Sequence, residues 1–190
     1  MMTLEEVKKL TEDKTYGRIP LTREIYSDIR TPMEVLRVLK QVSTHCYMLE
    51  SVEESKRWGR YTFLGFDPVL ELTCRDGLRI KGATTVEQKV EHPGDAIRKI
   101  LAENRSPKLP GLPTFTGGLV GYFAYDYIKY AEPTLKLEKG DEDSFQDVDL
   151  MLFDKVIAFD NFRQKIILIV NMKTDAPEQE YYKAQMELDK

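Results

Sequence analysis

Two neighbouring apolar segments, Leu150 to Phe159 and Lys165 to Met172, constrain the fold more than any other feature of this sequence. The short polar stretch Asn161 to Gln164 separates them, an arrangement that predicts a β-hairpin. A half-exposed strand alternates apolar and polar residues, whereas both of these segments are almost continuously apolar. We therefore expect both faces of the hairpin to be buried, which requires covering layers on each side.

Other strands are predicted by shorter segments. Tyr16 to Tyr26 has extended character, and Pro20 within it favours an edge strand or an irregular strand, because proline cannot donate to a neighbouring strand. Val69 to Thr73 and Leu78 to Lys81 flank an Asp-Gly turn, which predicts a second hairpin.

Four helices are predicted. The first two follow Thr3 and Thr31, each with a glutamate three residues later as in a capping box. The others begin after His92 and after Ala176. Residues expected to face the core are Leu4, Val7 and Leu10; Val35, Leu36, Leu39 and Val42; Ile97, Ile100 and Leu101; and Tyr181, Tyr182, Gln185 and Leu188. The predicted fold class is α+β, with mostly antiparallel sheets and flanking helices.

Three glycines interrupt the aromatic segment Phe115 to Tyr130. A phosphate-binding loop needs a strand, then glycines, then a helix. Gly117, Gly118 and Gly121 lie before and inside a predicted strand, so we expect close backbone packing or a bulge instead. The strand is expected to contain Tyr122, Phe123, Tyr125 and Tyr127.

Two segments are predicted to be irregular. Ser106 to Pro113 contains three prolines and predicts a stiff surface connection. Lys136 to Asp149 is dominated by carboxylates, but their order does not fit a calcium-binding loop, so a solvated loop is expected.

Composition excludes several classes of function. The chain has 190 residues and a formal net charge of −4, which argues against nucleic acid as the main partner. No apolar run reaches the length of a membrane span, and Met1 to Leu10 lacks a signal sequence, so a cytoplasmic protein without a membrane partner is expected. Cys46 and Cys74 are expected to remain unbridged and to be buried as small hydrophobic residues.

Candidate catalytic groups are scarce. His45 and His92 stand far apart, and neither has a cysteine or a carboxylate pair at metal-ligand spacing. The chain contains no G-x-S-x-G, H-E-x-x-H or C-x-x-C motif. No active site and no metal site are therefore predicted within these residues.

One candidate binding site lies where two predicted strands end. Tyr47 to Ser51 ends on Glu50 and Ser51, and Arg60 begins the next strand, which runs to Phe66. The loop between them holds Glu53 to Arg57 and the only tryptophan, Trp58. An acceptor, a donor and a cation beside apolar residues could bind a small zwitterion. Spacing alone favours a simpler interpretation, a surface strand end with an incidental ion pair.

Three segments resemble the amino-terminal region of the large subunit (component I) of anthranilate synthase. They are YGRIPLTREIYSDIRTPMEVLRVLK (16–40), MLES followed by RWGRYTFLGFDP (48–68), and FTGGLVGYFAYDYIKYAEP (115–133). The resemblance implies part of a layered αββα fold and a parent lyase that converts chorismate to anthranilate and pyruvate. It also implies ammonia from a glutamine amidotransferase subunit (component II), and Mg²⁺ bound outside these residues.

The resemblance further implies part of a site for feedback inhibition by L-tryptophan, with Leu49, Glu50 and Ser51 as its L-E-S element. Ser51 would hydrogen-bond the ligand, Glu50 would face its ammonium, and Leu49 would form part of the indole wall. Arg60 is assigned to the carboxylate from the expected strand pairing. Met48 replaces a leucine common in the family and keeps the apolar volume.

Residues 1–190 are thus expected to be an amino-terminal regulatory portion whose catalytic carboxy-terminal portion is absent. The uncapped final helix and the two-sided apolar hairpin agree with a fragment. Two alternatives remain: the equivalent portion of aminodeoxychorismate synthase component I, and a non-catalytic amino-acid-binding module.

Overall fold

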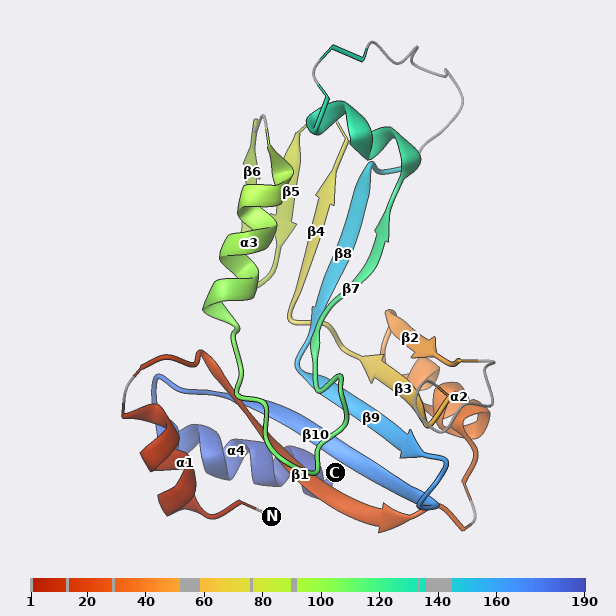
Figure 1. Cartoon of the computed structure of the whole chain (residues 1–190), viewed down its shortest axis with the longest axis vertical. Coiled ribbons are helices and arrows are strands. Elements are labelled where there is room, and N and C mark those ends of the chain that lie inside the picture. Colours follow the sequence, from red (N-terminus) through yellow and green to blue (C-terminus); the bar gives the residue numbers. More distant parts are fainter. Residues whose placement is uncertain are drawn as a thin grey trace.

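The computed structural model describes residues 2–12, 14–28, 30–51, 59–75, 77–89, 92–132, 134–135 and 145–190. Within them, two antiparallel sheets of five strands each have helices against one face (Figure 1). The first sheet contains, in order, β1 (Arg18–Tyr26), β10 (Lys165–Lys173), β9 (Lys155–Asp160), β3 (Tyr61–Phe66) and β2 (Cys46–Leu49). The second contains β6 (Thr85–Gln88), β5 (Leu78–Lys81), β4 (Leu70–Cys74), β8 (Val148–Phe153) and β7 (Gly118–Phe123).

The helices are α1 (Leu4–Thr11), α2 (Pro32–Val42), α3 (Pro93–Glu103) and α4 (Pro177–Asp189), with a 3₁₀ helix, η1 (Tyr125–Tyr130). Both capping boxes form, at Thr3 and at Thr31. β1, which carries Pro20, is an edge strand. The prediction of an α+β fold with antiparallel sheets and flanking helices is confirmed.

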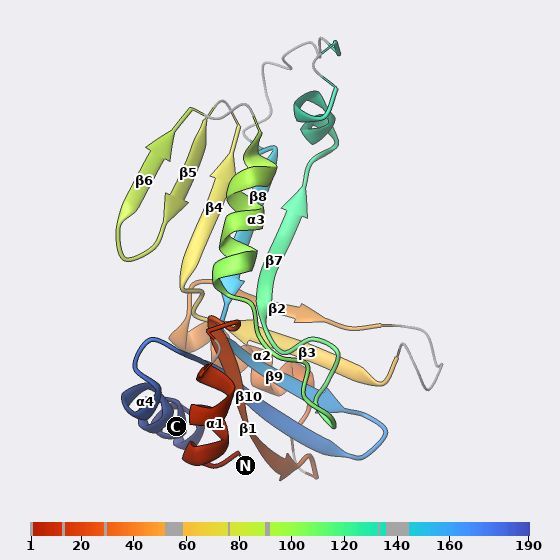
Figure 2. The same ribbon diagram turned by 60° about the vertical axis from the view of Figure 1, so that its left-hand side comes forward.

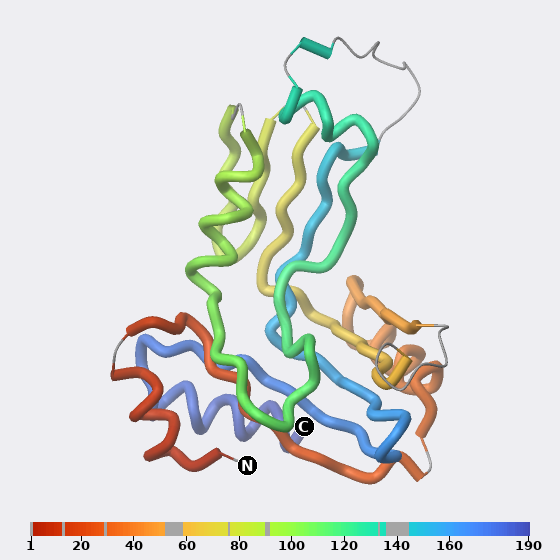
Figure 3. Tube along the Cα trace, in the orientation of Figure 1, coloured from red at the N-terminus to blue at the C-terminus, as the bar shows by residue number. Residues whose placement is uncertain are grey.

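The first sheet is buried on two faces around β9 and β10, as their sequences predict. Helices α1, α2 and α4 cover one face. On the other face Val156, Ala158, Ile167 and Ile169 form a cluster against which Phe115 packs. Phe115 belongs to the connection from α3 to β7, which runs down across this sheet (Figure 3). The connection was expected at the surface, but Pro107 and Pro113 are buried because it serves as a covering layer.

The predicted single strand Leu150 to Phe159 is wrong. The chain forms β8 in the second sheet, bends at Asp154 and continues as β9 in the first sheet (Figure 2). The carbonyl of Asp154 accepts hydrogen bonds from both the backbone amide and the side chain of Asn171. A polar corner of this kind allows a strand to change sheets.

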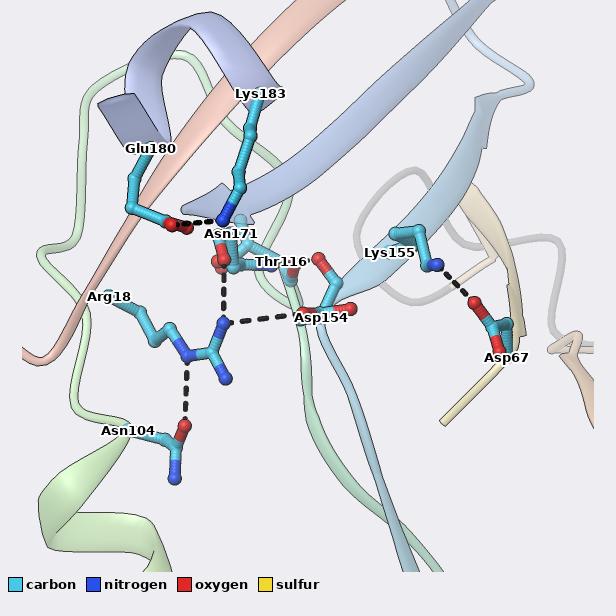
Figure 4. A network of polar contacts seen from close by, with 9 residues as sticks. All are labelled: Arg18, Asp67, Asn104, Thr116, Asp154, Lys155, Asn171, Glu180 and Lys183. Carbon is cyan, nitrogen blue, oxygen red and sulfur yellow. Dashed lines mark hydrogen bonds and ion pairs between the residues drawn. The ribbon is translucent and has the colours of Figure 1, made fainter. Parts of the chain in front are cut away.

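A buried polar junction joins the two sheets at this corner (Figure 4). Arg18 donates to Asn104 Oδ1 at 2.9 Å, to the Asn171 carbonyl at 3.1 Å and to Asp154 Oδ2 at 3.2 Å. Asn104 caps the end of α3, so the junction ties the helix of the second sheet to β1 and β10 of the first. Burial raises the pKa of Asp154, although Arg18 and Lys155 oppose the shift.

Three helix residues expected inside are exposed: Val42 to 69%, Leu101 to 49% and Tyr182 to 52%. The helices bury only narrow stripes, centred on Leu39 in α2 and on Tyr181, Ala184 and Leu188 in α4. Each helix lies on a sheet with solvent at its flanks, so residues beside the central stripe remain in water.

Tyr125 and Tyr127 lie in η1 and not in the predicted strand. The turn of η1 brings Tyr127 and Tyr130 against the core between α3 and the second sheet, which a straight continuation of β7 could not do. The expectation of close packing at the glycines is confirmed, because a Cβ on Gly121 would lie 1.9 Å from the Asp149 carbonyl oxygen.

The acidic segment departs from the predicted solvated loop at its end. Asp147 is 5% exposed, pairs with Lys129 at 2.6 Å and accepts a hydrogen bond from the Tyr130 hydroxyl at 2.8 Å. Asp149 lies within β8. Asp147 can be buried because two residues of η1, Lys129 and Tyr130, pair with its carboxylate. Residues 136–144 lie outside the described part of the chain.

Neither Cys46 nor Cys74 forms a disulfide, as expected; Cys74 is buried and Cys46 is half-buried. In the part of the chain that the structure describes, no helix has both the length and the apolar character needed to cross a membrane.

Candidate functional site

The candidate site lies at the end of β2 and the start of β3, which are neighbouring antiparallel strands. Leu49 is the last residue of β2 and pairs with Phe63. Glu50 and Ser51 follow at the open end of the strand, and both are exposed. Continuing the same register would place Ser51 across from Tyr61, next to Arg60. Topology therefore brings Leu49, Ser51 and Arg60 to one end of the sheet; Trp58 and Glu53 to Arg57 lie outside the described residues.

An aromatic strip runs along the face of the first sheet that Phe115 covers. It consists of Tyr61, Phe63, Phe115, Tyr47 and Phe153. Successive ring centroids in the strip are 5.7, 5.6, 6.5 and 4.8 Å apart. Leu49 lies beside it and is 47% exposed, while Tyr61 and Phe63 are half-buried. Rings at these distances make favourable edge and tilted contacts and offer a wall on which a further aromatic group could pack.

Tyr47 lies between Phe115 and Phe153 in the strip. Its ring lies over Gly65, where a Cβ would come within 2.1 Å of the ring carbon Cε1. The hydroxyl is buried with no hydrogen-bond partner in the described chain, and burial raises the pKa of Tyr47.

Arg60 is held in a defined orientation. It donates from Nε to Asp160 Oδ1 at 3.0 Å and from Nη2 to Asp160 Oδ2 at 2.6 Å. The guanidinium carbon lies 4.8 Å from the centroid of the Tyr61 ring and 5.7 Å from that of Phe162. The ion pair at this strand end is therefore a two-point bond to a residue 100 positions away in sequence.

Asp160 is the residue that sequence reasoning missed. It ends β9, is 2% exposed, and accepts hydrogen bonds from the amides of Phe162 and Arg163 in addition to Arg60. Burial by itself would raise the pKa of this carboxyl, but the hydrogen bonds from Arg60 and the two amides outweigh it and lower the pKa below 3.8. The signal in the sequence is an aspartate at the end of a buried apolar strand, because a buried carboxylate requires a partner.

The lowered pKa of Asp160 predicts a pH-dependent contribution to stability. A carboxyl with a lowered pKa stabilises the folded state fully above its unfolded-state pKa, and loses this contribution as pH falls through its folded pKa. Asp160→Asn should therefore lower the free energy of unfolding by about 1.5–3 kcal/mol at pH 7. In urea titrations the deficit should stay constant down to about pH 5 and shrink below the ordinary range of aspartate near 3.9.

Asp189→Asn, at an exposed carboxylate paired with Arg23, is the matched control. A deficit for Asp160→Asn that did not change with pH would contradict the proposed ionisation.

The geometry can bind a small anion with an aromatic body. The guanidinium of Arg60 is held in place by Asp160, and its Nη1 makes no hydrogen bond to the residues that the structure describes. The strip and Leu49 provide apolar surface. Ser51 and Glu50 are placed at the same strand end by their position in the chain. In the described residues no three His, Cys, Asp or Glu side chains group as metal ligands.

Comparison with known proteins identifies the family to which this chain belongs. The sequence profile of the chorismate binding enzyme family matches residues 44–189, so the chain belongs to that family. Its similarity is to the proteins named anthranilate synthase component 1, as the three sequence segments indicated. The relative from Acinetobacter calcoaceticus is 38% identical over 181 residues, and that from Acetivibrio thermocellus is 35% identical over 172 residues.

These alignments cover 92% and 90% of this chain but only 36% and 34% of the two relatives. The chain therefore spans about a third of the length of the curated relatives it matches. A crystal structure of anthranilate synthase component I from Streptococcus pneumoniae TIGR4 shares the fold, with a TM-score of 0.53 and 23% identity over 88% of this chain and 36% of that one.

Proposed function

We propose that this chain is the amino-terminal, regulatory portion of an anthranilate synthase large subunit. The observation that carries the proposal is the identity of 35–38% to proteins named anthranilate synthase component 1 over about nine tenths of the chain. The whole enzyme would convert chorismate to anthranilate and pyruvate, with Mg²⁺ and ammonia from a component II amidotransferase. The relatives' names favour this activity over aminodeoxychorismate synthesis.

The proposed role of the strand end is to bind L-tryptophan as a feedback inhibitor. Arg60 would take the carboxylate, Glu50 the ammonium and Ser51 a further hydrogen bond, while the indole would pack on Leu49 and the aromatic strip. The fixed guanidinium beside exposed apolar surface supports this assignment. Inhibition requires that tryptophan bind the inactive arrangement of the enzyme more tightly than the active one.

Ser51→Phe in the full-length protein should raise the tryptophan concentration for half-maximal inhibition at least tenfold, roughly 1.4 kcal/mol. A phenyl ring at this position removes a hydroxyl and fills the space beside Leu49. The measurement is anthranilate formation from chorismate across a tryptophan titration, with the rate without tryptophan recorded for each variant.

Thr84→Phe introduces the same ring at an exposed turn of the second sheet and is the control. If Ser51→Phe remained as sensitive to tryptophan as the unmodified protein, the site would be assigned wrongly. Absence of anthranilate as the product would contradict the proposed reaction itself.

A further inference from the structure

We propose that Asp160 is a positioning residue of the tryptophan site: it orients Arg60 so that the free side of the guanidinium meets the ligand carboxylate. This inference rests on the proposed function, and it assigns a role to a residue outside the L-E-S element. Asp160 does not touch the ligand in this proposal; it acts through Arg60.

The bonding pattern leaves donors available on one side of Arg60. A guanidinium has five N–H groups in a planar fork, and the contacts to Asp160 use one on Nε and one on Nη2. Nη1 has no hydrogen-bond partner among the described side chains and backbone groups, and the Arg60 side chain is 26% exposed. A second carboxylate can therefore bind in the plane of the guanidinium, on the side away from Asp160.

Asp160 is itself fixed, so it can transmit orientation. Its Oδ1 accepts from the amides of Phe162 and Arg163 at 3.2 and 3.1 Å, which locks the carboxylate to the turn after β9. The Asn161 amide donates to the Arg60 carbonyl at 2.9 Å, which ties the same turn to the start of β3. Tyr61 and Phe162 further restrict the guanidinium through ring contacts.

Orientation should matter more here than charge. An Arg60–Asp160 pair is close to neutral, so it attracts the ligand by directed hydrogen bonds and not by a net positive charge. Without Asp160 the long arginine side chain would have to be immobilised when tryptophan binds, and this loss of rotamer freedom opposes binding. We therefore expect removal of the carboxylate to weaken tryptophan binding even though it leaves Arg60 more positive.

The test is a double-mutant cycle on L-tryptophan binding to the full-length protein, measured by calorimetry. Asp160→Asn and Arg60→Met should each raise the dissociation constant at least tenfold. The double variant should bind no more weakly than Arg60→Met alone, because Asp160 acts only through Arg60. Asp189→Asn, at the exposed pair with Arg23, should leave the constant unchanged.

Arg60→Lys keeps the charge, changes only a partly exposed side chain, and cannot form the two-point bond. It should also weaken binding at least tenfold, which keeps the inference testable if Asp160→Asn does not fold. Independent, multiplying effects of Asp160→Asn and Arg60→Met would overturn the positioning role, as would unchanged binding in Asp160→Asn or in Arg60→Lys. Failure of the unmodified protein to bind tryptophan would instead overturn the proposed function, and this inference with it.

Discussion

Replacing Arg18 by methionine should lower the free energy of unfolding by about 3–5 kcal/mol at pH 7, because the change leaves a buried carboxylate without its cation. The side chains of Arg18 and Asp154 are only 10% and 20% exposed. Asp154 Oδ1 already has no hydrogen-bond partner in the described chain, and the variant would also remove the Arg18 hydrogen bond to Oδ2. Methionine retains most of the apolar stem, which separates loss of the charge from loss of packing.

The pH dependence of this deficit follows from the raised pKa of Asp154. A carboxyl whose folded pKa is raised favours the folded state below its unfolded pKa, and loses that advantage as pH rises through the folded value. Removal of Arg18 should raise the pKa further, because the nearby positive charge is lost. The deficit of Arg18→Met should therefore be largest at neutral pH and should decrease at acidic pH as Asp154 becomes protonated.

Urea unfolding at pH 7 and at pH 4.5 provides the measurement. Arg23→Met is the matched control, because Arg23 lies on the same strand and pairs with Asp189 at the surface. An exposed pair contributes about 0–1 kcal/mol, so this control should change little. Equal losses in the two variants would show that burial of the Arg18 junction does not determine its contribution.

The second large effect is expected at Gly17, just before β1. A Cβ built on this glycine would lie 1.8 Å from the carbonyl oxygen of Glu103 and 2.9 Å from its carbonyl carbon. The obstacle is backbone at the end of α3, which cannot move aside as a side chain could. The amide of Gly17 also donates to the Arg105 carbonyl at 2.9 Å, so separation of the two segments would strain this bond.

Gly17→Ala should therefore destabilise the protein by about 1–3 kcal/mol or more, the usual range for overpacking in a closely packed site. Gly77→Ala is the control, because its nearest neighbour to a new Cβ is 3.6 Å away. Thermal unfolding should show a clear decrease for Gly17→Ala and an unchanged or slightly higher stability for Gly77→Ala, by about 0.4–1 kcal/mol. Similar transitions for both variants would contradict the contact between Gly17 and α3.

Much of the candidate site could be located from sequence, and part of it could not. Leu49, Glu50, Ser51 and Arg60 follow from motifs within a short stretch, and the hydrogen-bonded ladder of β2 and β3 places them at one end of the sheet. Asp160 could not be found in this way. Its contact with Arg60 exists only because β9 lies beside β3, a pairing that depends on the order of strands in the finished sheet.

The same division holds for the fold. The capping boxes at Thr3 and Thr31, the edge position of β1 and the hairpin of β9 with β10 were determined by the sequence alone, since each depends on neighbours in the chain or on proline's missing amide. Only the tertiary structure decided that the chain changes sheets at Asp154, and that Arg18 and Asn171 meet there. Local spacing and residue type fix the first group, whereas contacts between residues far apart in sequence arise only when the sheets and the covering connection have packed together.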